Sequence, residues 1–349
     1  MAEEKKTQMQ YVRLGNSGLK VSKIILGCMS YGDPKWQGWV LDEEESIKHI
    51  RFAYEQGINT FDTANVYSNG QSEVVLGKAL KEIGAPRESY VVLTKAYNPV
   101  DDGPRGRPDV LKTGRGYVNE SGLSRKAIFD SVQASLKRLQ LDYIDVFQCH
   151  RFDYETPIAE TMQALHDIVQ KGWVRYIGMS SCWAYQFHAM QNYAINNKLT
   201  PFISMQNFHN AAYREEEREM LPTLKLFGVG AIPWSPLCRG FLTRPWQAEE
   251  TLRVKTDPQY KGRGHDRPDK SRQTINERVE EIAKKRGVSM AQVGLAWSLG
   301  HPDITAPIVG TTKLDNLTEL IGALDVELTP EEREYINEAY GPAAITGHV

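Results

Sequence analysis

The chain has 349 residues, of which 41% are hydrophobic and 25% are charged, and its formal net charge is −2. These values are ordinary for a protein with a sizeable core, and the near-neutral balance argues against nucleic acid or an anionic membrane as the main partner. No apolar run reaches the roughly 18 residues that a membrane span needs. The polar N-terminus lacks a signal-peptide pattern, so we expect a soluble, cytoplasmic protein.

The N-terminal residues 1–10 are polar, and we expect them to be disordered. From Tyr11 to Val21, two short strand-like runs flank a Gly-Asn-Ser-Gly turn, which predicts a β-hairpin. Strand and helix signals alternate from there onward, so residues 11–349 are predicted to form a single domain.

Eight short apolar runs are predicted to be strands that are buried on both faces. They are Ile24–Leu26, Thr60–Asp62, Tyr90–Lys95, Tyr143–Gln148, Val174–Ser180, Phe202–Gln206, Val229–Trp234 and Thr305–Val309. Helical patterns follow them at 42–57, 72–83, 124–139, 157–171, 184–197, 215–227 and 274–286, from 289, after 309 and from 329. Helix starts are indicated by Asp42, by Ser124, by Thr156-Pro157, and by capping boxes at Ser289 and Thr329.

Eight strand–helix units predict an α/β fold of the (β/α)8 type, the TIM barrel, with an N-terminal hairpin and extra helices. A doubly wound open sheet is the alternative. That fold normally carries a GxGxxG pattern after its first strand, and Gly27–Gly32 does not match it.

Two connecting segments, 96–123 and 238–273, are longer than loops usually are, so we expect them to serve function or to act as lids. The second segment either binds a phosphate or forms a solvated charged face, and both interpretations stay open. Its arginines are Arg239, Arg244, Arg253, Arg263, Arg267 and Arg272.

Polar side chains stand at the carboxyl ends of the predicted strands, where the active sites of this barrel lie. Asp62 and Lys95 end two strands, His150 follows a third, and Tyr67 lies on the loop after Asp62. Tyrosine has a reference pKa of about 10, and a nearby ammonium favours a phenolate. Tyr67, Lys95 and His150 therefore predict a site that protonates an oxygen as it gains negative charge, with Asp62 holding Lys95 charged.

This set contains no nucleophile, and the sequence has no HExxH, GxSxG or GxxxxGK[ST] motif. The missing reactant must come from a cofactor, and hydride from a nicotinamide fits. The four cysteines, at positions 28, 149, 182 and 238, show no CxxC spacing, so no metal site is expected. We expect reduced thiols that fill apolar space, with sensitivity to thiol reagents as the alternative.

Several segments, in their order along the chain, resemble motifs of the aldo-keto reductases over nearly the whole length. They are Leu14–Val21, Phe61–Ala64 with Tyr67, Leu93–Lys95, Asp145–His150, Val174–Ser180, Trp234–Leu237 and Pro307–Gly310. Within that family the chain is most similar to the aryl-alcohol dehydrogenase-like and versiconal hemiacetal acetate reductase-like branch, judged by Arg239–Thr243 and Leu295–Trp297.

The resemblance implies a catalytic tetrad of Asp62, Tyr67, Lys95 and His150, with Tyr67 as the proton donor. It implies a reversible, NADPH-dependent reduction of aromatic or aliphatic aldehydes and ketones, with NADH less favoured. The implied cofactor-binding residues are Gly27, Cys28, Met29, Asp62, Ser180, Ser181, Gln206, Trp234, Ser235, Pro236, Leu237, Arg239, Gly240, Gly310, Thr312, Asn316 and Glu319.

In that set Ser180 and Gln206 match positions that hold the nicotinamide carboxamide, and Trp234 matches the aromatic residue that stacks on the ring. Ordinary barrel core is the alternative place for Trp234. The chain departs from the family pattern at Ser181, where Asn is usual, at Leu320, where Asn is usual, and at Arg244-Pro245, where a lysine is frequent. These departures shift the expected dinucleotide contacts toward the arginines of 238–273.

Channel β-subunits also resemble this family, and they keep the fold while acting as partners of another protein. The alternative function is therefore a cofactor-binding regulatory subunit with little turnover.

Overall fold

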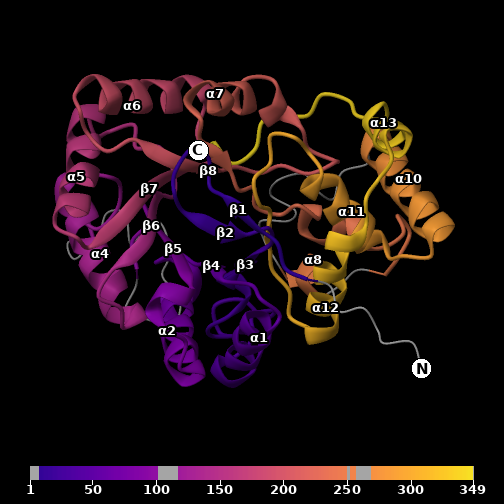
Figure 1. The fold of residues 1–349 in the computed structure, drawn as a ribbon, viewed down its shortest axis with the longest axis horizontal. Coiled ribbons are helices and arrows are strands. Elements are labelled where there is room, and N and C mark those ends of the chain that lie inside the picture. The colour runs from indigo at the N-terminus through magenta and orange to yellow at the C-terminus, as the bar shows by residue number, and fades with distance from the viewer. Residues whose placement is uncertain (1–7, 101–116, 250–251, 257–268, 349) are drawn as a thin grey trace.

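The computed structural model describes residues 8–100, 117–249, 252–256 and 269–348. Its centre is an eight-stranded parallel sheet in the order β10-β3-β4-β5-β6-β7-β8-β9, seen in the middle of Figure 1. Parallel bridges join Ala231 to Ile304 and Trp234 to Ile308, so the two outer strands of this order also meet. The sheet therefore closes into the barrel that the sequence predicts.

The strands of the barrel are short and mostly buried. They are β3 (Ile25–Gly27), β4 (Thr60–Asp62), β5 (Val91–Ala96), β6 (Ile144–Cys149), β7 (Val174–Ser180), β8 (Phe202–Gln206), β9 (Gly230–Ala231) and β10 (Ile308–Val309). Every residue of β5 and β6 is buried, as expected for strands between a packed interior and a layer of helices. Because all eight strands are parallel, their carboxyl ends gather at one end of the barrel.

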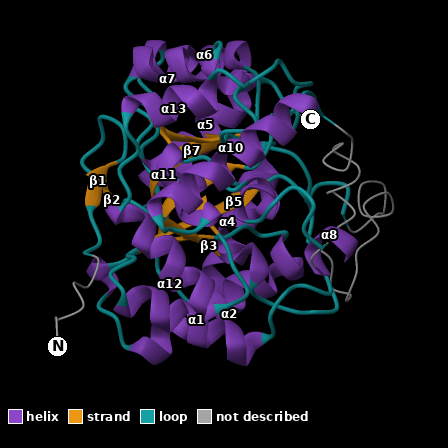
Figure 2. Cartoon of the chain, turned by 90° about the vertical axis from the view of Figure 1, so that its right-hand side faces the viewer, coloured by secondary structure: helices purple, strands orange, loops and turns teal. Residues whose placement is uncertain are grey.

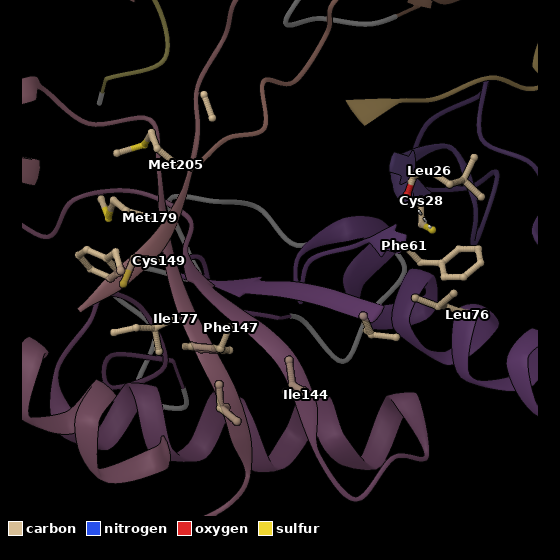
Figure 3. Packing of buried hydrophobic residues seen from close by; sticks show 14 of the residues in the cluster. Leu26, Cys28, Phe61, Leu76, Ile144, Phe147, Cys149, Ile177, Met179 and Met205 are labelled. Atoms are coloured by element: carbon tan, nitrogen blue, oxygen red, sulfur yellow. Dashed lines mark hydrogen bonds between the residues drawn. The ribbon is translucent and has the colours of Figure 1, made fainter. Parts of the chain in front are cut away.

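Helices enclose the strands, as the side view in Figure 2 shows. They are α1 (Glu43–Glu55), α2 (Gln71–Ile83), α4 (Arg125–Leu139), α5 (Ile158–Gln170), α6 (Ala184–Asn196), α7 (Met220–Phe227), α8 (Leu252–Thr256), α10 (Lys270–Arg286), α11 (Met290–Leu299), α12 (Leu314–Gly322) and α13 (Pro330–Asn337). The apolar faces of α1, α2, α4, α5, α6 and α7 pack on the sheet, and Figure 3 shows part of that core around Phe61, Phe147 and Met179. Helices α10 and α13 instead bury their apolar residues in a second cluster with Trp297.

Four predicted helix starts are confirmed by their cap hydrogen bonds. The side chains of Asp42 and Ser124 accept from backbone amides of the first turn. Ser289 and Thr329 form complete capping boxes with Gln292 and Glu332 respectively. These local interactions involve neighbouring residues alone, which is why they can be predicted from short segments of sequence.

The predicted hairpin is present and closes the amino end of the barrel. It consists of β1 (Tyr11–Arg13) and β2 (Lys20–Ser22), paired antiparallel. Leu14 and Val21 are fully buried and belong to one apolar cluster with Val146 of the barrel interior. Figure 2 shows the hairpin at one end of the molecule, with α8 and the C-terminus at the other. The carboxyl ends of the strands are therefore the end at which a site can open.

Two strands are shorter than predicted. The runs Val229–Trp234 and Thr305–Val309 were expected to be strands throughout, but only β9 and β10 form regular ladders within them. Pro233 and Pro307 have no amide hydrogen to donate, so each interrupts its ladder.

The helix predicted over 215–227 is wrong in its first part. Residues Glu215–Glu217 form a short 3-10 turn, η4, and α7 begins only at Met220. Pro222 explains the difference: it is tolerated in the first turn of α7, but it would lie in the interior of a helix that began at residue 215.

Other boundaries also differ from the predictions. The cap expected at Thr156 is absent, because its hydroxyl donates to Asp153 Oδ2 at 2.6 Å and Pro157 takes the cap position. Helix α10 begins at Lys270, earlier than the predicted 274. Residues 1–7 lie outside the described part of the chain, as do 101–116 of the first long loop and 250–251 and 257–268 of the second. Met9 is buried, so the expected disorder does not extend to residue 9.

Candidate active site

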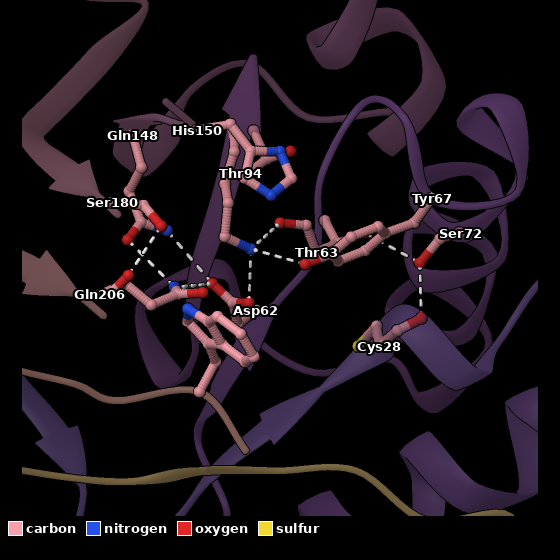
Figure 4. Close-up of polar contacts among 12 residues, drawn as sticks. Cys28, Asp62, Thr63, Tyr67, Ser72, Thr94, Gln148, His150, Ser180 and Gln206 are labelled. Carbon is pink, nitrogen blue, oxygen red and sulfur yellow. Dashed lines mark hydrogen bonds and ion pairs between the residues drawn. The ribbon is translucent and has the colours of Figure 1, made fainter. Parts of the chain in front are cut away.

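The four residues predicted as a tetrad meet at the carboxyl end of the barrel. Asp62 is the last residue of β4, Lys95 lies in β5, and His150 directly follows β6. Tyr67 begins η2 (Tyr67–Gly70), the turn that connects β4 to α2. Figure 4 shows Asp62 between the side chains of β6 and β8 on one side and Tyr67 on the other.

The ammonium of Lys95 is the centre of the site. Its side chain is fully buried, and Nζ donates to Asp62 Oδ1 at 2.6 Å and to the backbone oxygen of Thr63 at 2.7 Å. The third N–H of Lys95 Nζ points to the phenol oxygen of Tyr67, and the distance of 3.4 Å between Nζ and this oxygen is that of a weak hydrogen bond. An ammonium has three donors, so all three are accounted for. The lysine therefore fixes the position of the phenol.

The carboxylate of Asp62 also has hydrogen-bond partners on both of its oxygens. Its Oδ2 accepts from Gln148 Nε2 at 3.1 Å and from Gln206 Nε2 at 2.8 Å, and Gln206 Nε2 also donates to Gln148 Oε1 at 3.1 Å. Sequence reasoning missed Gln148. Its position two residues before His150 could have revealed it, because alternate residues of a strand face the same side.

The charge on Lys95 follows from these contacts. Burial alone lowers the pKa of an ammonium, but the carboxylate of Asp62 and the phenol of Tyr67 outweigh that effect, so the pKa of Lys95 is raised. Lys95 therefore stays protonated at neutral pH.

His150 and Tyr67 face each other across the mouth of the barrel. Their ring centroids lie 5.8 Å apart with an interplanar angle of 83°, an edge-to-face contact. The turn that carries Tyr67 is strained, since Ser68 and Asn69 have φ values of 49° and 51°. Such backbone strain persists only where surrounding contacts hold it, and it is typical of functional sites.

Trp234 is held in one orientation at the adjoining edge of the mouth. Its ring stacks on Phe208 with centroids 4.5 Å apart and an angle of 20°, and Phe208 in turn stacks on Tyr213. The indole Nε1 donates to Ser181 Oγ at 3.2 Å, and the amide of Ser181 donates to Asn207 Oδ1. Trp234 thus lies at the site rather than in the closed core.

The segment after Trp234 turns back on itself. Ser235, Cys238, Arg239 and Gly240 have φ values of 52°, 49°, 56° and 90°. The amides of Cys238 and Gly240 donate to the backbone oxygens of Ser235 and Leu237, at 2.9 and 3.0 Å, so the turn is closed by its own hydrogen bonds. The side chain of Arg239 is buried and its guanidinium lies 5.9 Å from the Trp234 ring centroid.

Two glycines allow β3 and β10 to approach each other closely. A Cβ at Gly27 would lie 2.9 Å from a methyl carbon of Ile308, and one at Gly310 would lie 3.3 Å from the oxygen of Gly27. Cys28, which directly follows Gly27, is fully buried, and its backbone oxygen accepts from Ser72 Oγ at 2.7 Å.

The remaining predicted cofactor residues are distributed along this rim. Ser180 ends β7, where its hydroxyl donates to the backbone oxygen of Gln206 at 2.7 Å. Pro236 and Leu237 belong to the turn after Trp234. Thr312 follows β10, and Asn316 and Glu319 lie one turn apart on α12. The ring of Trp234 and the polar side chains of Ser180 and Gln206 fit a nicotinamide ring and its carboxamide.

The C-terminal residues reach this rim, which the sequence did not predict. Tyr340 Oη donates to Glu215 Oε1 at 2.7 Å, and the amide of Thr346 donates to the phenol oxygen of Tyr213 at 3.0 Å. Gly347 then lies beside the indole of Trp234. No local pattern marks this arrangement, because every contact joins residues more than 100 positions apart.

The cysteines are all buried and free, as expected of residues that fill apolar space. Burial raises the pKa of Cys28, Cys149, Cys182 and Cys238, which keeps the thiols protonated.

A second polar cluster joins His209, Glu217 and His301, whose potential ligand atoms lie within 4.8 Å of one another. Arg214 donates to both oxygens of Glu217, at 2.8 and 2.7 Å. That guanidinium already satisfies the carboxylate and would repel a cation, so the cluster is best explained as an ion-pair network.

The geometry defines a barrel oxidoreductase, and comparison with known proteins agrees. Residues 23–341 match the profile of the Aldo/keto reductase family, so the chain belongs to that family and is an oxidoreductase. The family carries out carbonyl reduction on small molecules with a nicotinamide cofactor. None of the described helices combines the length and apolar character needed to cross a bilayer.

Individual relatives cover almost the entire chain. The versiconal hemiacetal acetate reductase of Aspergillus parasiticus is 53% identical over 97% of this chain and 98% of its own length. A Schizosaccharomyces pombe protein whose name proposes an aryl-alcohol dehydrogenase is 48% identical, with the same shares. The aldo-keto reductase AMT2 of Alternaria alternata is 45% identical over 99% of this chain and 95% of its own length. These names favour an enzyme over a regulatory subunit.

The Asp62–Lys95 pair predicts a reversal in the pH dependence of stability. In the wild type the pKa of Lys95 is raised above 10.5, so the stability from its charge is present below pH 10.5 and is lost as the pH rises through the folded pKa. In Asp62→Asn, burial dominates and the pKa falls below 10.5. The variant should then gain stability as the pH rises from 7 to 10.

Urea denaturation at each pH measures this effect. At pH 7, Asp62→Asn should lose about 3–5 kcal/mol of unfolding free energy, because it leaves a buried charge unpaired. Glu44→Gln, which removes one partner of the exposed Lys48, serves as the control and should change little. Equal stability of Asp62→Asn and wild type at pH 7 would contradict the role given to the pair.

Proposed function

We propose that this protein is an NADPH-dependent reductase of aldehydes and ketones that also runs in reverse, with Tyr67 as the general acid. One observation carries the proposal: the phenol oxygen of Tyr67 lies 3.4 Å from the fully buried ammonium of Lys95. A phenol in contact with a fixed positive charge can release its proton to a substrate oxygen, because the phenolate that remains is stabilised.

The residues of the site then have distinct roles. When bound, the nicotinamide supplies a hydride to the carbonyl carbon. Tyr67 donates its proton to the carbonyl oxygen as that oxygen gains negative charge. Lys95 stabilises the phenolate left behind, and Asp62 keeps Lys95 charged and oriented. His150, edge-on to Tyr67, donates a hydrogen bond to the same oxygen.

The dinucleotide would lie along the rim from β7, past β8, β9 and β10, to β3. Trp234 would stack on the nicotinamide ring, and Ser180, Ser181 and Gln206 would contact its carboxamide. Gln206 would do so while keeping its bond to Asp62, which links cofactor position to the proton donor. The other residues of this binding site would be Gly27, Cys28, Met29, Ser235, Pro236, Leu237, Arg239, Gly240, Gly310, Thr312, Asn316 and Glu319.

For the substrate we propose aromatic aldehydes and related carbonyl compounds. The names of two relatives support this class, since one is a reductase of a hemiacetal acetate and the other is proposed to act on aryl alcohols.

Removal of the phenol hydroxyl tests the proton donor. In Tyr67→Phe, kcat for an aromatic aldehyde should fall by about 10²–10⁴-fold, the contribution that a general acid usually makes. NADPH oxidation, followed by absorbance, measures the rate. Tyr185→Phe removes a hydroxyl from an exposed ring and serves as the control. A Tyr67→Phe enzyme with an undiminished rate would sink the assignment.

Cofactor choice can be tested by binding alone. The 2′-phosphate of NADPH adds negative charge, and Lys313 stands at the strand end where the adenosine is expected. Fluorescence titration should therefore give a lower Kd for NADPH than for NADH, and Lys313→Met should narrow that difference. Lys171→Met, an exposed lysine next to α5, should leave it unchanged. Tighter binding of NADH by the wild type would overturn the preference.

A further inference from the structure

Arg151 is a cation at the candidate active site that the proposed mechanism does not use. It directly follows His150 after β6, and its side chain is half-buried. Its guanidinium donates through Nη1 to the backbone oxygen of His150 at 2.5 Å. A guanidinium has five N–H donors in a fixed fork, so this bond leaves most of its capacity unused.

Arg151 also has no counter-charge. Among the residues that the structure describes, no carboxylate lies within 4.0 Å of its guanidinium. Two other partly buried arginines have one, since Arg87 is paired with Asp145 and Arg138 with Glu73. Arg333 also lacks a carboxylate, but it donates through two nitrogens to the backbone oxygens of Trp297 and Ala296. Because burial of an unpaired charge costs free energy, the absence of a counter-charge at Arg151 needs a reason.

The nearest acid in the sequence, Asp153, is committed to other groups. Its Oδ2 accepts from the amide of Leu123 at 2.7 Å and from Thr156 Oγ1 at 2.6 Å, and its Oδ1 accepts from the amide of Glu155 at 3.0 Å. These bonds fix the loop after β6. Asp153 is therefore a structural residue and not the partner of Arg151.

The position of Arg151 places it at the mouth of the barrel, because it directly follows His150 at the carboxyl end of β6. Burial lowers the pKa of Arg151, and the two side chains that oppose this shift are Tyr67 and Tyr97. Both are phenols on segments at the carboxyl ends of neighbouring strands, and phenols are neutral at ordinary pH. Arg151 thus lies at the carboxyl end of β6, and in the described part of the chain no carboxylate pairs with its guanidinium.

A cation held in this way is suited to bind an anionic ligand. The planar fork of arginine matches the two oxygens of a carboxylate, and such charge-assisted pairs are the strong hydrogen bonds of proteins. A substrate with its carbonyl oxygen at Tyr67 would lie at the same end of the barrel as Arg151.

We propose that Arg151 binds a carboxylate of the substrate, so that the enzyme prefers carbonyl compounds that carry an acidic group near the reacting carbonyl. The proposal rests on the proposed reductase function, since it assigns the substrate class of that same site. Arg151 is then a specificity-determining residue.

A matched pair of substrates tests this role. We would measure kcat/KM with NADPH for 3-carboxybenzaldehyde and for its methyl ester, which differ in one negative charge. The wild type should favour the acid. In Arg151→Met the ratio of acid to ester should fall by about 10- to 100-fold, the effect of losing charge-assisted hydrogen bonds, with most of the change in KM for the acid.

Two further variants separate the effect of the guanidinium at position 151 from the effect of charge alone and from the loss of an arginine elsewhere. Arg151→Lys keeps the charge but loses the fork, so it should restore part of the preference. Arg175→Met serves as the matched control, because Arg175 also donates to a backbone oxygen, that of Gly172 at 2.7 Å, but is exposed near the amino end of β7. It should leave the ratio unchanged.

The outcomes separate the two proposals. The carboxylate role is overturned if Arg151→Met lowers kcat/KM for the acid and for the ester by the same factor. It is also overturned if the wild type shows no preference for the acid. If the wild type reduces neither compound, the reductase function fails instead. In that case the affinity for isophthalate, measured by calorimetry, tests the anion site at Arg151. Weaker binding to Arg151→Met than to the wild type supports the site, and equal binding overturns it.

Discussion

The buried ion pair between Lys95 and Asp62 is the interaction on which the rest of the site depends. An ammonium without exposure to water is tolerated only when its charge and all of its donors are satisfied. Asp62, Thr63 and Tyr67 meet that requirement from a neighbouring strand and the turn after it. The pair thereby joins β4 to β5, and its outer oxygen extends the network through Gln206 to β8. A change in any of these contacts displaces the phenol.

The fold also decides where this charge can act. The N-terminal hairpin fills the amino end of the barrel, with Leu14 and Val21 in the interior cluster. The polar network lies at the other end, where the phenol of Tyr67, the ring of His150 and the rim around Trp234 adjoin it. A small molecule that bound there would meet the proposed proton donor, Tyr67, with Lys95 and Asp62 on the side away from the ligand. That arrangement suits a reaction in which an oxygen gains charge as it is protonated.

Much of this architecture could be predicted from the sequence, because it depends on local patterns. Apolar runs located the eight strands, and their ends placed Asp62, Lys95 and His150 in one layer. The contacts that escaped prediction are tertiary. Nothing near Gly347 in the sequence indicates that it lies beside Trp234. Likewise, the lack of a counter-charge for Arg151 becomes visible only when the partners of its neighbours are known. The prolines at 233 and 307 are visible in the sequence, but which ladder hydrogen bonds they remove depends on the register of the neighbouring strands.

The central claim is that Tyr67 and Lys95 act as one unit in proton transfer. A double-mutant cycle on kcat, with Tyr67→Phe, Lys95→Met and the combined variant, tests it most directly. If the lysine acts only through the phenol, the double variant should be no slower than Tyr67→Phe alone. Rate losses that multiply, so that the double variant is slower by the product of the two single effects, would contradict the account.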